Sequence, residues 1–178
     1  NATGATLVVT GKNTVTLTDL LVGEVWLCSG QSNMEWSVKQ AANAEVETAA
    51  AKFPLIRHIK IDRTVATAPA DTVKTTGWQT TTPDTVGKFT AVGYYFARDL
   101  FQKLNVPIGL VNSSWGGTPV ESWLSPAALA TNPAFAVVAE RWKQNVADYP
   151  AKKAAYTAAL AEWTKAEAAA KRPAAPAT

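Results

Sequence analysis

The sequence has only one cysteine, Cys28, and one histidine, His58. A lone cysteine excludes a disulfide within the chain, and these two residues cannot make a His/Cys cluster with metal-ligand spacing. Only 17% of the 178 residues are charged, and the 17 Lys and Arg are scattered rather than gathered into a run. We therefore expect no metal, no cofactor and no nucleic-acid partner.

Long hydrophobic runs are also missing. No stretch of 18 apolar residues occurs, so we expect no transmembrane helix and no membrane partner. The start, Asn1-Ala2-Thr3, lacks Met and the charged-then-apolar pattern of a signal peptide, which suggests a processed or excised chain. The 47% of hydrophobic residues is enough to build the core of one ordinary globular domain.

The hydrophobic pattern changes period along the chain. Alternating apolar and polar residues predict a β-hairpin over 6–18. Short apolar runs then alternate with helical periodicities, as is typical of an α/β fold with a doubly wound parallel sheet. The expected buried strands are 25–28, 55–61 and 108–111, and the expected helices are 43–53 and 89–104.

Two further segments have a distinctive composition. Residues 62–87 are crowded with Thr, Pro and Asp, which predicts a long loop anchored by Trp78. Beyond the N-cap signal Ser125-Pro126, residues 126–172 read as an amphipathic helical pair lying on the domain, broken at Tyr149-Pro150. The Ala- and Pro-rich residues 171–178 read as an exposed linker of the kind that proteases cut.

Loops of small residues follow two of the expected strands. Ser32 lies in Gly30-Gln31-Ser32-Asn33-Met34, and residues 112–119 form the second loop. Because the carboxyl ends of parallel strands share one edge of a sheet, we expect the loops to meet. From these five residues alone a helix cap is the better interpretation of Ser32, although a strand-end serine before a helix can also serve as a nucleophile.

Three longer sequence segments favour the interpretation of Ser32 as a nucleophile. Residues 23–36 read GEVWLCSGQSNMEW, residues 89–98 read FTAVGYYFAR, and residues 112–123 read NSSWGGTPVESW. Together they closely resemble the sialate O-acetylesterase family, carbohydrate esterases of the SGNH hydrolase superfamily. The resemblance implies a flavodoxin-like parallel sheet, present only in its amino-terminal part over 23–178, with 1–22 as the trailing hairpin of a β-rich domain.

The same resemblance implies a catalytic site. Ser32 would attack the acetyl carbonyl to give an acyl-enzyme that water hydrolyses. The backbone N–H of Ser32 and that of Gly116 or Gly117, with Gly116 favoured, would form the oxyanion hole. Residues that would contact the sugar are Gln31, Asn33, Trp36, Trp115 and Trp123. The three tryptophans serve equally well as packing residues.

The chain also departs from a complete esterase. The family's Gln-Gly-Glu-type block and its late Asp-x-x-His motif do not occur in these 178 residues. His58 has Leu55 three residues before it rather than Asp, so we interpret it as a structural or surface histidine. Without a base, the chain alone should be nearly inactive. We expect a complementary carboxyl-terminal polypeptide carrying Asp-x-x-His.

The sequence therefore predicts a secreted or periplasmic serine esterase that removes O-acetyl groups from sialic acid or from an acetylated plant polysaccharide. The secreted location follows from the family and the glycan substrate. The alternative is an inactive fragment, or a carbohydrate-binding module that binds sugar through Trp36, Trp115 and Trp123 without turnover.

Overall fold

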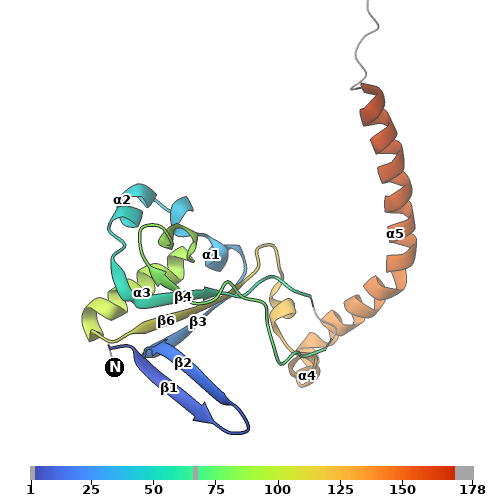
Figure 1. The fold of residues 1–178 in the computed structure, drawn as a ribbon. Helices are drawn as coiled ribbons and strands as arrows, with labels where there is room; N and C mark the ends of the chain where they lie inside the picture. The colour runs from blue at the N-terminus through green and yellow to red at the C-terminus, as the bar shows by residue number, and fades with distance from the viewer. Residues whose placement is uncertain (1–2, 66–67, 171–178) are drawn as a thin grey trace, which may run out of the picture. The chain divides into compact units, whose positions relative to one another are not determined.

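The computed structural model describes residues 3–65 and 68–170. The chain divides into two compact units, Asn1–Val120 and Glu121–Thr178. Strands and helices alternate in the first unit, whereas the described elements of the second are helical (Figure 1). The predicted boundary at residue 22 stays a prediction, because the hairpin belongs to the first unit together with the sheet.

The predicted hairpin is confirmed. Strands β1 (Ala5–Thr10) and β2 (Thr14–Leu20) pair antiparallel, with Leu7 opposite Leu17. Most of their side chains are exposed, so the hairpin adds little to the core. Its outgoing end is tied to the sheet by an ion pair between Asp19 and Arg57, at 2.8 Å.

The sheet has four strands in the order β3-β6-β4-β5: β3 (Glu24–Gly30), β6 (Ile108–Ser114), β4 (Phe53–Lys60) and β5 (Gln79–Thr81). The first three are parallel and β5 is antiparallel to β4. The predicted α/β class with a mostly parallel sheet is confirmed. The order differs from a flavodoxin-like sheet, in which β3 would lie between β4 and β6.

Helices cover one face of this sheet, as Figure 1 shows. They are α1 (Ser32–Glu35), η1 (Val38–Gln40), α2 (Ala44–Ala49), η2 (Val86–Lys88) and α3 (Ala91–Leu104). Alternate side chains of the strands, including Cys28, Ile56 and Leu110, are buried in the core. Close packing of α3 depends on Gly93, because a Cβ there would lie 2.8 Å from Cys28 Sγ. The interpretation of Cys28 as a small buried side chain is confirmed.

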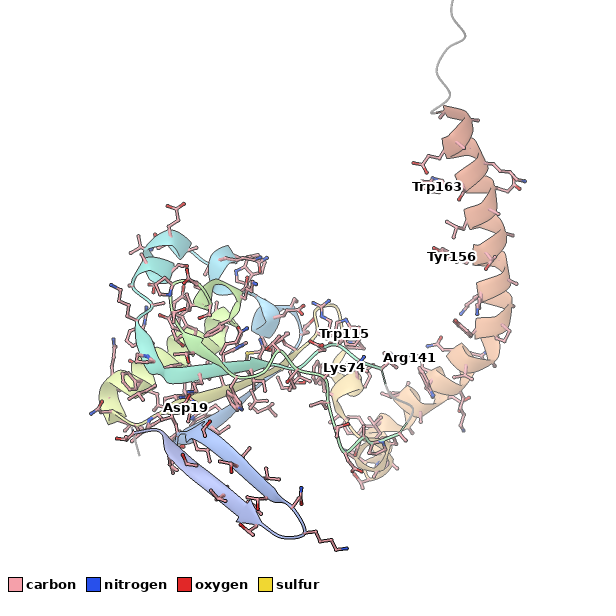
Figure 2. The ribbon with its side chains drawn as sticks, in the orientation of Figure 1. Asp19, Lys74, Trp115, Arg141, Tyr156 and Trp163 are labelled. Carbon is pink, nitrogen blue, oxygen red and sulfur yellow. The ribbon has the colours of Figure 1, made fainter. Side chains whose placement is uncertain are left out.

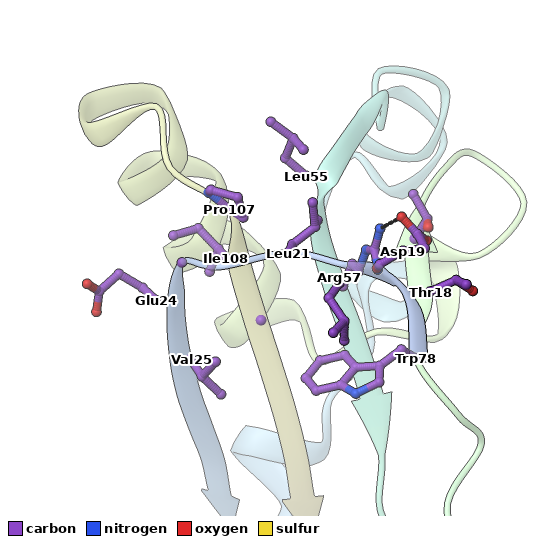
Figure 3. A pocket seen from close by; sticks show the side chains of 14 residues that line it. Thr18, Asp19, Leu21, Glu24, Val25, Leu55, Arg57, Trp78, Pro107 and Ile108 are labelled. Atoms are coloured by element: carbon purple, nitrogen blue, oxygen red, sulfur yellow. Dashed lines mark hydrogen bonds and ion pairs between the residues drawn. The ribbon is translucent and has the colours of Figure 1, made fainter. Parts of the chain in front are cut away.

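The expectation that β3 is a fully buried strand is wrong, because the side chains on its other face are exposed. Val25 and Leu27 are 66% and 68% exposed. The reason is that β3 lies at the edge of the sheet, with β6 as its partner in the described chain, and its side chains alternate between a covered and an uncovered face. A hollow of about 400 Å³ lies on this side, where Trp78 packs beside Gly109 and near Arg57 (Figure 3). Trp78 is 50% exposed, and its role as the anchor of the segment 62–87 stays a prediction.

Several element boundaries differ from the prediction. The last parallel strand continues to Ser114 instead of ending at residue 111. The segment 62–87 contains β5 and the start of η2, and the helix expected over 43–53 ends at Ala49. In each case, pairing or packing against a neighbouring element decides the boundary that local composition left open.

The second unit contains α4 (Pro126–Ala130), η4 (Pro133–Phe135) and α5 (Ala136–Ala170). Ser125 caps α4 by accepting a hydrogen bond from the Ala128 N–H, as predicted. The predicted break at Pro150 is wrong, because α5 continues through it as one bent helix (Figure 1). Tyr156 and Trp163 project from α5 and are 66% and 60% exposed (Figure 2).

Some predicted features lie outside the described residues, namely the start of the chain at 1–2 and the linker with its cleavage site at 171–178. Among the helices that are described, none combines the length and apolar character needed to cross a membrane.

Candidate functional site

The carboxyl ends of the three parallel strands bring the candidate residues together. Ser32 follows β3, Lys60 ends β4, and Gly116 follows β6. The Trp115 N–H donates to the Gly30 carbonyl at 2.9 Å, which joins the two loops directly. The expectation that these loops meet at one edge is confirmed.

Ser32 occupies the first helical position of α1 and is exposed. The N-cap of this helix is Gln31, whose carbonyl accepts from the Met34 and Glu35 N–H groups. Gly30 precedes the turn with φ +131°, a conformation that favours glycine. Ser32 is therefore not the capping residue, and its hydroxyl stands at the start of the helix.

Gly116 lies directly against this serine. A Cβ at Gly116 would come within 3.5 Å of Ser32 Cα and Cβ and 2.8 Å of Glu35 Oε2, so the approach requires glycine. The Gly116 N–H donates to Glu35 Oε2 at 2.8 Å. Gly117 has φ +79° and open space around it. Of the two glycines considered for the oxyanion hole, Gly116 thus has its N–H engaged by a carboxylate.

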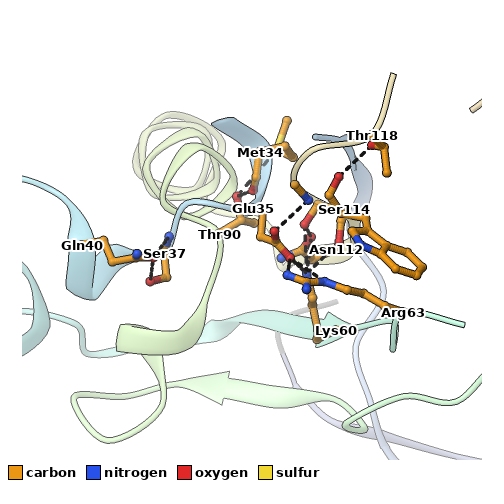
Figure 4. Close-up of polar contacts among 12 residues, drawn as sticks. Met34, Glu35, Ser37, Gln40, Lys60, Arg63, Thr90, Asn112, Ser114 and Thr118 are labelled. Atoms are coloured by element: carbon orange, nitrogen blue, oxygen red, sulfur yellow. Dashed lines mark hydrogen bonds and ion pairs between the residues drawn. The ribbon is translucent and has the colours of Figure 1, made fainter. Parts of the chain in front are cut away.

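Glu35 is one of three site residues, with Lys60 and Arg63, that the sequence motifs did not indicate. Besides Gly116, its carboxylate accepts hydrogen bonds from Arg63, with Nε at 3.0 Å, and it lies 3.9 Å from Lys60 Nζ (Figure 4). Partial burial raises the pKa of Glu35, but the hydrogen bonds from Arg63 and Gly116 and the two positive charges outweigh it and lower the pKa overall. Glu35 is therefore ionised at neutral pH and connects the segments that follow all three strands.

Lys60 forms a second connection beneath this carboxylate. Its Nζ donates to Ser114 Oγ at 2.9 Å, to the Ser114 carbonyl at 3.3 Å and to Asn112 Oδ1 at 3.5 Å. Ser114 Oγ also donates to Asn112 Oδ1 at 2.7 Å. Desolvation lowers the pKa of Lys60, while nearby Glu35 opposes that shift. This network fixes the end of β6, from which the Gly116 loop starts.

The sequence left two interpretations of His58 open, a structural or a surface histidine. The structure shows that it is structural. It is 2% exposed and stacks on Phe89 with ring centroids 4.3 Å apart. Burial, with a smaller contribution from Lys60, lowers its pKa to about 4. Its Nε2 is buried and has no hydrogen-bond partner among the described residues. A buried, stacked imidazole whose pKa is lowered to about 4 is a weak base and is closed off from substrate, so it is poorly suited to be a general base.

The residues expected to contact sugar are distributed as follows. Gln31 and Asn33 are exposed on either side of Ser32, and Trp36, the C-cap of α1, is 51% exposed. Trp115 is half-buried, and the Arg63 guanidinium lies 5.8 Å from the centre of its ring. Trp123, in η3 (Val120–Trp123), belongs to the second unit. Within 3–65 and 68–170, no group of three or more His, Cys, Asp or Glu residues could hold a metal ion.

The missed residues carry a recognisable signal. Lys60 and Arg63 flank the end of a strand, and Glu35 lies one helical turn after Ser32. Polar residues at the carboxyl ends of parallel strands are the expected lining of an α/β site. The fold and this edge define an α/β protein with an exposed serine where its parallel strands end.

Comparison with known proteins identifies the family. The model of the carbohydrate esterases described as sialic acid-specific acetylesterases matches residues 22–171, and the chain belongs to this family. The resemblance found in the sequence is thereby confirmed.

The chain is similar to part of several known proteins. It is 43% identical over 125 residues to the sialate O-acetylesterase of Rattus norvegicus, covering 65% of this chain and 23% of that protein. It is 37% identical over 124 residues to the human sialate O-acetylesterase, covering 65% of this chain and 24% of that protein. A crystal structure of a carbohydrate acetylesterase from Xanthomonas citri matches with 41% identity and a TM-score of 0.67, covering 71% of this chain and 30% of that one. The chain thus spans about a quarter of the length of its curated relatives.

Proposed function

We propose that this chain supplies the nucleophile and part of the oxyanion hole of a serine esterase that removes O-acetyl groups from sugars. The observation that carries the proposal is the exposed Ser32 at the first position of α1, with the Gly116 loop against it. The hydroxyl attacks the acetyl carbonyl and gives its proton to a base, and the sugar hydroxyl then leaves with a proton. Water hydrolyses the acyl-enzyme and releases acetate.

The oxyanion hole is proposed to use the Ser32 N–H and the N–H of Gly117. The first N–H groups of a helix have no partner within it, so that of Ser32 is available to an oxyanion. Gly117 is preferred to Gly116 because the Gly116 N–H already donates to Glu35. Gly116 would contribute only after breaking that hydrogen bond.

The general base is proposed to come from outside these residues. His58 is buried and stacked, and its pKa of about 4 makes it a weak base. An Asp-x-x-His motif on a complementary carboxyl-terminal polypeptide would supply base and orienting carboxylate. The chain alone is then nearly inactive, since loss of such a base costs roughly 10⁶ in turnover in a well-studied protease triad.

The free edge of β3 is the proposed place where that polypeptide joins. In the described chain β3 pairs with β6, so its other edge presents unpaired N–H and C=O groups. If β4 is not counted, β3 and β6 correspond to the first and second strands of a flavodoxin-like order. The later strands of that order would then pair with the free edge of β3. The exposed Val25 and Leu27 would be covered in the completed fold. Residues 1–22 would be the end of a preceding β-rich domain.

The proposed substrates are O-acetylated sugars, either sialic acid or an acetylated polysaccharide. Gln31 and Asn33 flank the nucleophile and would bond to sugar hydroxyls. Trp36 and Trp115, both in the first unit, would offer ring faces. A substrate of this kind places the protein in the periplasm or outside the cell.

The second candidate is a carbohydrate-binding module without turnover, which the half-exposed Trp36 beside the Ser32 turn favours. The two functions differ in one variant. Ser32→Ala leaves the binding of sugar to a module unchanged, whereas it abolishes the release of acetate by an esterase.

The test is labelling of the assembled protein with a serine-directed fluorophosphonate. A denaturing intact-mass spectrum first establishes whether a companion with an Asp-x-x-His motif is present. We expect the label on Ser32, and we expect Ser32→Ala to abolish both labelling and acetate release. Ser113→Ala, a half-buried serine in β6, is the control and should retain both. Labelling of another serine, or acetate release that survives Ser32→Ala, would refute the proposal.

A further inference from the structure

Helix α5 carries a row of exposed aromatic side chains outside the candidate site. They recur at every seventh residue, as Trp142, Tyr149, Tyr156 and Trp163. Their exposed fractions lie between 60% and 69%. Figure 2 shows Tyr156 and Trp163 projecting from the helix. Neither the family resemblance nor the proposed chemistry uses these four rings.

The spacing of the rings is the period at which α-helices pair. Seven residues make almost two full turns, so the four rings lie along one side of the helix. The residues three positions before each ring lie on the same side, and they are Ala139, Val146, Lys153 and Leu160. Positions separated alternately by three and four residues form the narrow seam along which two helices pack as a coiled coil. These eight residues are the α5 seam.

The described chain holds no second helix that matches this seam. The seam extends over four heptads of a helix with 35 residues, none of which is buried. The next longest helix among the described residues is α3, with 14 residues. It packs on the sheet through Ala97, Leu100 and Phe101. A second copy of the chain, in contrast, provides a helix of the same length and the same period.

We propose that α5 pairs with α5 of a second copy of this chain, running antiparallel, with Ala151 of both copies at the centre. In this register each ring faces one of the other residues of the seam. Trp142 faces Leu160 and Trp163 faces Ala139 of the second copy, so a large side chain lies against a smaller one. A parallel pair would set each tryptophan against the same tryptophan. Close packing requires large and small side chains to interdigitate, which favours the antiparallel pair.

Two features at the centre of α5 agree with this register. Pro150 lies beside Ala151, where the helix bends (Figure 1). Both copies then bend at the same level, so they remain in contact on either side of the bend. Lys153, the one charged residue of the seam, faces Tyr149 of the second copy, and its Nζ already lies 5.9 Å from the ring centre of Tyr149 in its own helix. A lysine above a tyrosine ring is a favourable cation–π contact.

The rings expose enough area for a specific interface. A covered Tyr or Trp side chain buries roughly 150 to 250 Å². Four rings in each copy, with Val146 and Leu160 between them, approach the about 800 Å² per partner that is typical of stable complexes. None of these residues belongs to the candidate site, so the inference does not depend on the proposed function.

The test is the molar mass of the 178-residue chain, measured by analytical ultracentrifugation over a wide range of concentrations. We expect a reversible change from 18.9 kDa to twice that mass as the concentration rises. Tyr149→Glu with Tyr156→Glu puts charges into the seam and should raise the dissociation constant of the dimer at least about tenfold. The matched control is Ala151→Glu with Ala158→Glu, which adds the same charge at the same spacing on the opposite face of α5. It should leave the dissociation constant unchanged.

A second variant separates lost pairing from a damaged helix. Tyr149→Ala with Tyr156→Ala removes the rings with the best helix former and should also weaken the dimer. Far-ultraviolet circular dichroism reports whether α5 persists in each variant. A chain that stays monomeric at every concentration would overturn the inference, also if its tryptophan fluorescence responds to soluble xylan and so assigns the rings to glycan binding. A dimer that neither tyrosine variant weakens overturns it too, and points to another surface such as the free edge of β3.

Cross-linking tests the direction of the pair. Cys28 is buried, so a new exposed cysteine reacts selectively. Val138→Cys and Ala166→Cys are prepared separately, mixed, and treated with a short bis-maleimide. In the antiparallel register, position 138 of one copy lies beside position 166 of the other, so we expect the cross-link to join the two variants. Cross-links only between identical variants would mean a parallel pair and would refute the proposed arrangement.

Discussion

Glu35 accounts for the local geometry around the serine more than any other side chain. Its carboxylate joins Arg63, beyond β4, to Gly116, beyond β6, while its own helix follows β3. A charged hydrogen bond to a backbone N–H is stronger than a neutral one, so the loop at Gly116 is held firmly beside Ser32. The sequence motifs indicate the serine and the glycines but not Glu35, which links them.

His58 gives a prediction for the pH dependence of stability. Its pKa is about 4 in the folded protein, below its ordinary 6.5. The unfolded chain therefore binds a proton that the folded protein does not, and the free energy of unfolding falls as pH decreases from about 6.5 towards 4. The shift corresponds to about 3 kcal/mol, all of it present above pH 6.5.

The measurement is urea unfolding at intervals from pH 7 to pH 4.5, for the original chain and for His58→Phe. The substitution keeps a ring to stack on Phe89 and removes the titrating group. The original chain should lose more stability than the variant over this interval. An identical slope in both would show that His58 is not responsible.

Among the elements, α1 and α3 are joined by one hydroxyl. Thr90 Oγ1 donates to the Met34 carbonyl at 2.6 Å and accepts from the Gly93 N–H at the start of α3. Thr90 is 1% exposed, so water cannot replace its hydroxyl as the hydrogen-bond partner of the Met34 carbonyl and the Gly93 N–H. It secures the short helix that carries Ser32 to the long helix that covers the sheet.

Thr90→Val should therefore lower the free energy of unfolding by roughly 1 to 3 kcal/mol, because valine keeps the shape but leaves a buried carbonyl and a cap N–H unpaired. Thr90→Ser retains the hydroxyl and serves as the control, with a smaller loss from its missing methyl group. Chemical denaturation at neutral pH measures both. Equal losses in the two variants would attribute the effect to packing instead of hydrogen bonding.

In helix α5, the rule that proline ends a helix gave a wrong prediction. Proline in a helix interior removes one hydrogen bond and crowds the preceding turn, which favours a break at Pro150. The helix nevertheless extends for several turns on both sides of Pro150, and the sequence after it is rich in Ala, which has high helical propensity. Propensity summed over those turns outweighs one lost bond, and the helix bends instead of ending.

For the whole molecule, the two units differ in how they are stabilised. Both clusters of buried apolar residues, one around Tyr94 and one around Ile56, lie within residues 1–120. Helix α5 buries none of its residues. The first unit therefore has a core of its own, and the stability of the second does not come from one.

We expect residues 1–120, expressed alone, to unfold cooperatively with a thermal midpoint near that of the 178-residue chain. The fragment should lose the circular dichroism of α5 but keep its mixed α/β spectrum. Scanning calorimetry and far-ultraviolet circular dichroism measure this, at low concentration to limit association through the free edge of β3. A fragment without a cooperative transition would mean that the second unit is needed for folding.

The sequence by itself determined the hairpin, the parallel strands, the cap at Ser125 and the two loops that meet at one edge, because these depend on local periodicity, turn chemistry and motif strings. Only the tertiary structure decided the strand order, the exposed face of β3, the continuation of β6 to Ser114 and the commitment of the Gly116 N–H to Glu35. These features arise from contacts between residues far apart in the chain, such as Glu35 with Arg63 and Lys60 with Ser114. No local pattern encodes such distances, and packing and hydrogen bonding fix them only when the chain folds.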